Sequence, residues 1–98
     1  MERIRYSLHT TSEYGRDIRR IIRKDVKLAR KILSCIKKIR VNPFDASLGT
    51  HRVLLPSLGR VFSSRVNGDI RIIWTLHDRN IILLLRIGGH SGSSKVYR

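Results

Sequence analysis

The sequence predicts an α+β fold in which two helices pack on one face of an antiparallel sheet. Three observations support this prediction. Apolar residues recur with helical spacing in the first half of the chain, and they alternate with polar residues in the second half. Asn67-Gly68 lies between two of the alternating segments and is a strong hairpin signal. We expect residues 1–98 to form one domain, because a chain of this length can bury a single modest core.

The N-terminal half is expected to contain a short strand and then a helix. Apolar and polar residues alternate over residues 3–8, which is typical of a strand. Thr10 is followed by Glu13 three positions later, a capping-box pattern, so a helix should begin there. The apolar stripe of this helix consists of three isoleucines: Ile18, Ile21 and Ile22.

A second helix is expected between a turn at Lys24-Asp25 and the dipeptide Asn42-Pro43, because the residue before a proline disfavours helical backbone. Five residues form its apolar face: Leu28, Ile32, Cys35, Ile36 and Ile39. Cys35 is the only cysteine, so an internal disulfide is excluded. Its position within the apolar face favours a buried side chain over a nucleophile.

The C-terminal half is expected to be mostly strand. Residues 44–59 contain two glycines and a proline and are predicted to be mostly loop. Three strands should follow at residues 61–66, 69–77 and 80–87, with a possible edge strand at 95–98. The central one places Trp74 in a row with Ile70 and Ile72, so Trp74 is predicted to be a core residue.

The charge balance indicates a polyanionic partner. The chain has 21 Lys and Arg against 7 Asp and Glu, a net charge of +14, so RNA, DNA or an acidic protein is expected to bind it. Ten of the basic residues crowd the predicted helices: Arg16, Arg19, Arg20, Arg23, Lys24, Lys27, Arg30, Lys31, Lys37 and Lys38. The longest apolar run covers only residues 81–85, and the N-terminus has no signal-peptide core. We therefore expect a cytoplasmic protein without a membrane partner.

Strand alternation suggests a phosphate site. Arg65, Arg71 and Arg86 should share the sheet face that the helices leave uncovered, with Arg86 opposite an apolar row of Leu83, Leu85 and Ile87. The alternative is a solvated face with scattered arginines.

No histidine pair has the spacing of a metal site, so we expect no metal. His90 follows Gly88-Gly89 and is either an acid–base catalyst or an ordinary surface residue. Tyr97 either stacks on a base or covers the sheet edge.

Four motifs occur in order along the chain: Asn42-Pro43-Phe44, the hairpin from Ser64 to Trp74, the segment from Arg86 to His90, and Val96-Tyr97-Arg98. Together they resemble the RelE/ParE superfamily of toxins from type II toxin–antitoxin pairs, over nearly the whole chain. Within it, the sequence is most similar to the RelE/YafQ-like branch of mRNA interferases. Ile70, in place of that branch's tryptophan, and the long stretch at 91–94 before Val96 depart from the pattern.

The resemblance implies a toxin that cleaves mRNA on the ribosome without a metal or cofactor, through attack of the ribose 2′-hydroxyl on the adjacent phosphate. It assigns catalysis to Arg65, to His90 as acid or base, and to Tyr97 as the substrate-orienting aromatic. The expected substrate-binding residues are His51, Arg60, Asp69, Arg71, Arg86 and Arg98. The expected partners are an acidic antitoxin, mRNA and the ribosome.

Two other functions remain open at this point. A ParE-like toxin would inhibit DNA gyrase through a protein contact, without catalysis, and it generally lacks the acid–base histidine, so His90 speaks against it. A basic nucleic-acid-binding module would use the same arginines to bind without cutting.

Overall fold

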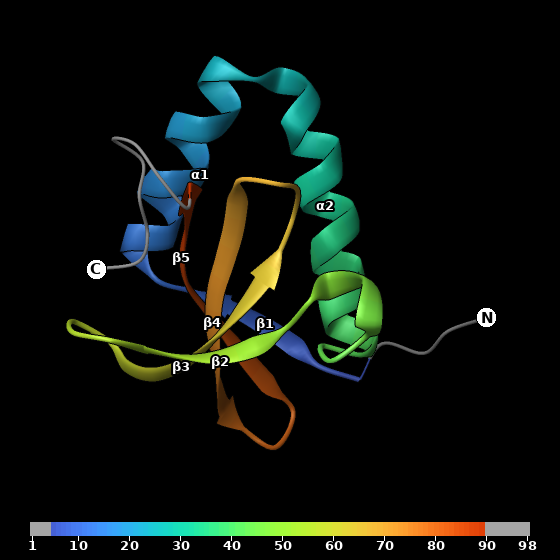
Figure 1. Cartoon of the computed structure of the whole chain (residues 1–98), viewed down its shortest axis with the longest axis vertical. Coiled ribbons are helices and arrows are strands. Elements are labelled where there is room, and N and C mark those ends of the chain that lie inside the picture. Colours follow the sequence, from blue (N-terminus) through green and yellow to red (C-terminus); the bar gives the residue numbers. More distant parts are fainter. Residues whose placement is uncertain (1–4, 90–98) are drawn as a thin grey trace.

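The structure, a computed structural model, describes residues 5–89 and places two helices against one face of a five-stranded sheet (Figure 1). The elements follow in the order β1 (Ser7–Thr10), α1 (Ser12–Lys24), α2 (Val26–Val41), the 3₁₀ helix η1 (Ala46–Leu48), β2 (His51–Leu55), β3 (Gly59–Arg65), β4 (Ile70–Asp78) and β5 (Ile81–Gly89). The sheet order is β1-β5-β4-β3-β2, with β1 parallel to β5 and the other pairs antiparallel. The predicted α+β class is confirmed. The edge strand expected at 95–98 lies outside the described residues.

The two helices begin where a polar side chain accepts from an amide of the first turn. Thr11 caps α1: its Oγ1 accepts from the Tyr14 amide at 3.0 Å and donates to the Leu85 carbonyl at 2.8 Å. The predicted cap at Thr10 is therefore wrong by one residue, because Thr11 can also bond to β5. Asp25 forms the predicted turn and caps α2, accepting from the Leu28 amide at 3.3 Å.

The main core lies between the helices and the sheet. Ile32, Cys35 and Ile39 of α2 pack with Ile72 and Trp74 of β4. Trp74 is fully buried and Cys35 is 5% exposed, so both predictions of burial are confirmed. Burial raises the pKa of the Cys35 thiol to about 11, which keeps the thiol protonated at neutral pH and agrees with a structural role.

The buried face of α1 differs from the predicted isoleucine stripe. Tyr14, Asp17 and Ile21 are the buried residues, whereas Ile18 and Ile22 are only partly buried. The sequence prediction missed Asp17 because carboxylates are rarely buried unless they are paired. The spacing of Tyr14, Asp17 and Ile21 is that of one helix face, and this was the available signal.

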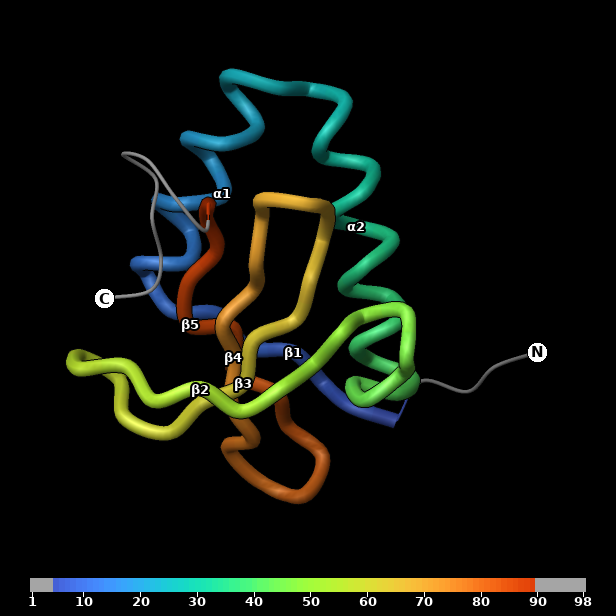
Figure 2. The backbone as a smooth tube through the Cα atoms, in the orientation of Figure 1, coloured from blue at the N-terminus to red at the C-terminus, as the bar shows by residue number. Residues whose placement is uncertain are grey.

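The segment 44–59 is more ordered than predicted. It contains η1 and the edge strand β2, which pairs with β3 from His51↔Ser63 to Leu55↔Gly59. Figure 2 shows this hairpin extending away from α2, and its two strands are joined by a turn at residues 56–58. An edge strand with three exposed residues, His51, Arg52 and Leu54, lacks the continuous apolar signal of a central strand. The composition therefore resembled that of a loop.

A β-bulge changes which residues of β5 face the main core. Ile73 pairs with Arg86 while Trp74 pairs with Leu84, which leaves Leu85 as the extra residue. Leu84 and Ile87 therefore both pack in the main core, and Leu85 packs on the opposite face. The predicted row of Leu83, Leu85 and Ile87 is wrong, because strict alternation does not continue through a bulge.

Tyr14 provides a direct test of the core. Its hydroxyl is buried and has no hydrogen-bond partner among residues 5–89, and burial raises the pKa of the phenol. A buried unsatisfied donor costs about 1–3 kcal/mol, so we expect Tyr14→Phe to raise the free energy of unfolding by about 1 kcal/mol. Urea denaturation measures the change, with Tyr6→Phe as the matched control. A loss of stability at Tyr14→Phe would mean that the hydroxyl has a partner.

Candidate functional site

The sheet face opposite the helices gathers several of the predicted site residues. Directly paired residues of neighbouring strands point to the same face. The pairs are His51↔Ser63, Ser63↔Ile73, Arg65↔Arg71 and Ile73↔Arg86. Ile73 packs with Leu55 and Val61 in a second apolar cluster on this face. We call this surface, defined by His51, Arg65, Arg71 and Arg86, the open face.

Arg65 and His51 meet at the backbone of Gly49. Gly49 has φ +55° at the end of η1, and a Cβ atom built on it would lie 3.5 Å from Cζ of Arg65. The guanidinium of Arg65 therefore packs over the Gly49 backbone, while the residue itself is exposed. The Gly49 carbonyl lies 3.1 Å from Nδ1 of His51. Because a carbonyl oxygen only accepts, Nδ1 carries the proton in this contact, and Nε2 of the neutral ring keeps its lone pair.

A chain of buried and partly buried hydrogen bonds holds the backbone next to Gly49 in place. Trp74 Nε1 donates to Ser64 Oγ at 2.8 Å, and Ser64 Oγ lies 2.7 Å from Thr50 Oγ1. Thr50 Oγ1 in turn donates to the Pro43 carbonyl at 2.6 Å. The carbonyl at the end can only accept, so Ser64 donates to Thr50. These hydrogen bonds fix the segment that leads into β2 relative to the core. The sequence contains no signal for them beyond the presence of polar residues.

Arg71 contacts its own hairpin. Its Nη1 donates to the Asn67 carbonyl at 2.6 Å and its Nη2 to the Gly68 carbonyl at 3.4 Å. The predicted turn is present, and the Asn67 side chain accepts from the amides of Asp69 and Ile70 at 2.8 and 2.7 Å. Asp69 is exposed in this turn. Arg71 thus shares the face of Arg65, but part of its hydrogen-bonding capacity stabilises the turn.

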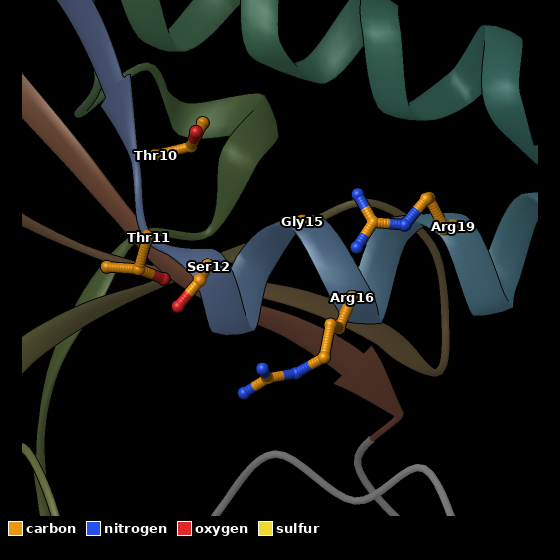
Figure 3. Close-up of a pocket in the computed structure, with 6 residues that line it drawn as sticks. All are labelled: Thr10, Thr11, Ser12, Gly15, Arg16 and Arg19. Carbon is orange, nitrogen blue, oxygen red and sulfur yellow. The ribbon is translucent and has the colours of Figure 1, made fainter.

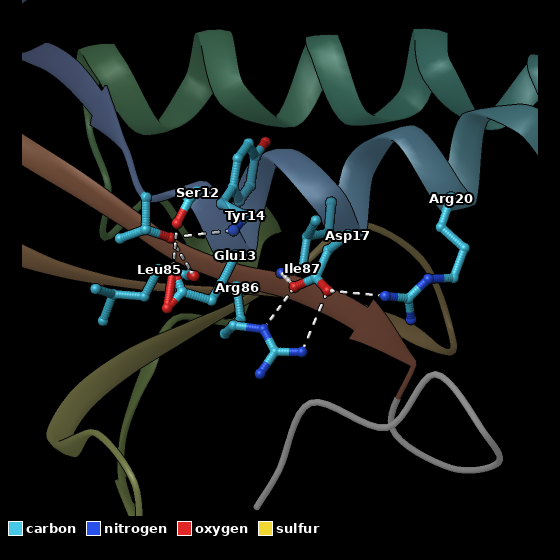
Figure 4. Close-up of polar contacts among 9 residues, drawn as sticks. Ser12, Glu13, Tyr14, Asp17, Arg20, Leu85, Arg86 and Ile87 are labelled. Carbon is cyan, nitrogen blue, oxygen red and sulfur yellow. Dashed lines mark hydrogen bonds and ion pairs between the residues drawn. The ribbon is translucent and has the colours of Figure 1, made fainter.

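Arg86 lies on the open face and pairs with Asp17 of α1. Its Nε donates to Asp17 Oδ2 at 2.6 Å and its Nη2 to Oδ1 at 3.2 Å (Figure 4). The three arginines therefore share one face as predicted, although Arg65 is exposed while Arg71 and Arg86 are partly buried. The role of Asp17 was not predicted.

The remaining predicted site residues are not brought together by the described structure. Arg60 pairs with Leu54 and lies an odd number of positions from Arg65 along β3, so its side chain is on the opposite sheet face. Arg60 thus does not join the open face. The predicted residues His90, Tyr97 and Arg98 lie outside the described residues.

The helices carry a separate basic surface. All ten basic side chains predicted there are exposed, so they point away from the core. A surface pocket of about 430 Å³ at the start of α1 includes Arg16 and Arg19 with Thr10, Thr11 and Ser12. Figure 3 shows both guanidiniums directed back along α1 toward its N-terminal end. None of the residues of the open face lines this pocket.

Two further features concern metal and membrane. Within residues 5–89, no group of three or more His, Cys, Asp or Glu side chains is arranged to hold a metal ion. In that same part of the chain, no helix is long and apolar enough to span a membrane.

Comparison with known proteins finds one related toxin sequence and several solved structures of similar fold. No protein-family model matches the sequence. The toxin YoeB of Synechocystis sp. is 33% identical over 60 residues, which cover 61% of this chain and 69% of that protein. The toxin–antitoxin complex DinJ–YafQ of E. coli contains a chain of similar fold, with a TM-score of 0.69 and 20% identity over 89% of this chain and 94% of that chain.

Two more solved structures extend the likeness in fold. The YoeB–YefM complex of Staphylococcus aureus gives a TM-score of 0.68 with 20% identity, covering 89% of this chain and 99% of that chain. The archaeal RelE–RelB complex of Pyrococcus horikoshii OT3 gives a TM-score of 0.70 with 12% identity, covering 92% and 100%. At these identities the structures establish the fold, and the sequence match to YoeB establishes the relationship.

Proposed function

The chain belongs to the RelE family of type II toxins, and on this premise we propose that it is an endoribonuclease that cleaves mRNA on the ribosome. The observation that carries the proposal is the meeting of Arg65 and His51 over Gly49 on the open face. An exposed guanidinium and an imidazole both contact Gly49 there. These are the groups needed to stabilise and to initiate phosphoryl transfer without a metal.

The reaction is attack of a ribose 2′-hydroxyl on the adjacent phosphorus. The base removes the 2′-hydroxyl proton as the 2′-oxygen forms its bond to phosphorus. The P–O5′ bond then breaks, and the leaving 5′-oxygen takes a proton from the acid. The products are a 2′,3′-cyclic phosphate end and a 5′-hydroxyl end. Negative charge grows on the phosphorane between these steps, where guanidinium groups stabilise it most.

The roles follow from the geometry of the open face. His51 suits the base, because its Nδ1–H is directed at the Gly49 carbonyl and its Nε2 remains available. Arg65 suits the stabilisation of the phosphorane, since its side chain is exposed and packs over a glycine that cannot obstruct it. His90 is proposed as the acid that protonates the leaving oxygen, and Tyr97 as the aromatic that orients the substrate.

The basic helix surface is proposed to hold ribosomal or messenger RNA. If so, RNA affinity should fall steeply with salt, because each neutralised phosphate of a single strand contributes a slope of about 0.7 in log–log units. Replacing Arg30 and Lys31 by glutamate should lower that slope by about 1.4. Fluorescence anisotropy with a labelled RNA at several salt concentrations measures it. The control is Arg79→Glu in the β4–β5 turn, and an unchanged slope in the double variant would remove this surface from RNA binding.

The partner is proposed to be an acidic antitoxin. The solved relatives YafQ, YoeB and RelE are described in complexes with DinJ, YefM and RelB. A chain with net charge +14 is complementary to an acidic segment laid across its basic surfaces. Expression of the chain alone should arrest growth, and co-expression of its antitoxin should relieve the arrest. Growth at full rate during high expression would contradict the toxin activity.

The nuclease proposal is tested with purified protein and ribosomes that carry a defined message. Primer extension should reveal new 5′ ends that appear only with the toxin and only on ribosome-bound message. A parallel assay of gyrase supercoiling identifies the other known outcome for this superfamily. Arrested growth with inhibited gyrase and intact message would replace the nuclease by a gyrase inhibitor.

A further inference from the structure

Asp17 is a buried carboxylate whose hydrogen bonds come largely from β5. Only 5% of its side chain is exposed. Its Oδ2 accepts from Arg86 Nε at 2.6 Å and from the Ile87 amide at 3.1 Å, and its Oδ1 accepts from Arg86 Nη2 at 3.2 Å (Figure 4). Arg20 approaches Oδ1 to 3.8 Å from the exposed side of α1. Asp17 therefore connects α1 to two consecutive residues of β5.

This pairing fixes an orientation as well as a charge. Two donors of one guanidinium meet two oxygens of one carboxylate, which sets the plane of the guanidinium. The Ile87 amide then sets the carboxylate relative to the backbone of β5. The hydrogen bond to Asp17 also raises the pKa of Arg86 further, so the guanidinium stays charged. A solvated pair on the surface would leave the guanidinium free to rotate.

The fixed guanidinium belongs to a residue of the open face. The bulge at Leu85 brings Arg86 opposite Ile73, on the same face as Arg65. The Arg86 side chain is 32% exposed, so it remains accessible while it is paired. Its Nη1 takes no part in the pair with Asp17, which uses Nε and Nη2.

We propose that Asp17 is a positioning residue that holds Arg86 so that the edge of its guanidinium that does not contact Asp17 binds the phosphate to be cleaved. The inference rests on the proposed endoribonuclease function. It gives a role in that function to Asp17, which lies on α1 and is not part of the open face. A donor held in place before the substrate arrives needs no reorganisation during the reaction, and this is how fixed dipoles stabilise a developing charge. Asp17 acts through Arg86 and does not itself contact the RNA.

A double-mutant cycle tests whether Asp17 acts through Arg86. Wild type, Asp17→Asn, Arg86→Ala and the double variant are compared in single-turnover cleavage of ribosome-bound message, at saturating toxin and well below every melting temperature. Asp17→Asn is expected to lower the rate constant by about tenfold or more, since a small displacement of a catalytic group has effects of this order. The double variant should be no slower than Arg86→Ala, because the two losses share one cause.

Chemical rescue separates positioning from a structural role. Guanidinium chloride at low millimolar concentration should restore part of the activity of Arg86→Ala, because the Asp17 carboxylate can hold the free guanidinium ion in the vacated place. The same addition should not restore the double variant. Asp25→Ala is the matched control: it removes a helix-capping carboxylate, so it should lower the melting temperature and leave the cleavage rate constant unchanged.

The outcomes are distinct. Losses that multiply in the double variant, or guanidinium rescue that does not depend on Asp17, would overturn the positioning role while the nuclease remains. A lowered melting temperature of Asp17→Asn with an unchanged rate constant would make the pair purely structural. If wild-type toxin cuts no RNA under these conditions, the nuclease proposal fails, and the positioning role fails with it.

Discussion

Arg65→Ala is expected to reduce single-turnover RNA cleavage by about 10²–10³-fold. Removing one donor that stabilises a transition-state charge costs roughly 3 kcal/mol in comparable sites. The fold should survive, because the Arg65 side chain is exposed and the hydrogen bond from Cys35 Sγ at 3.6 Å goes to its backbone carbonyl, which the substitution keeps. The rate constant for cleavage of ribosome-bound message, measured with saturating protein, separates this effect from binding.

Arg79→Ala is the matched control for Arg65→Ala. Arg79 is an exposed arginine in the turn between β4 and β5, where its amide bonds to the Asp78 side chain at 2.7 Å. The Arg79→Ala substitution removes the same charge and leaves the residues of the open face unchanged. If both variants cut at the wild-type rate, Arg65 has no catalytic part and the open face is not the site.

His90→Ala is expected to lose about 10²–10⁴-fold in cleavage, the usual contribution of a general acid or base. The expectation rests on the position of His90 after Gly88-Gly89 and on the family relationship, since the residue lies outside the described structure. The rate constant is measured in single-turnover cleavage of ribosome-bound message at saturating protein.

His77→Ala is the matched control for His90→Ala, because His77 is exposed near the end of β4 and is not one of the residues of the open face. It should behave like wild type. Should His90→Ala retain the full rate while Arg65→Ala does not, the site is real but another residue supplies the acid. His51→Ala would then be the next variant to compare.

Most of the fold was predictable because its signals are local. The helical spacing of Ile32, Cys35 and Ile39 and the alternation of Ile70, Ile72 and Trp74 both appear in the structure as predicted. The elements that were missed depend on tertiary contacts. β2 is an edge strand whose pairing with β3 outweighs a loop-like composition, and the bulge at Leu85 has no signature in a single sequence.

The site was predictable in part for the same reason. Alternation alone placed Arg65 and Arg71 on one face, and their direct pairing confirms it. What could not be predicted is what each guanidinium contacts: Gly49 for Arg65, the hairpin carbonyls for Arg71 and Asp17 for Arg86. Arg60, expected to bind substrate, lies an odd number of positions from Arg65 along β3, so alternation already separates the two residues.

The central claim is that a ribose 2′-hydroxyl is the nucleophile when this toxin cuts RNA. Removing that hydroxyl from the message tests the claim most directly. A message with a single 2′-deoxynucleotide immediately 5′ to the mapped cleavage point is bound to ribosomes and treated with wild-type toxin, beside the all-ribose message. The account predicts that the all-ribose message is cut to a 2′,3′-cyclic phosphate and a 5′-hydroxyl end, and that the deoxy-substituted message stays intact at that point. Cleavage of the substituted message at the same position and rate would contradict it.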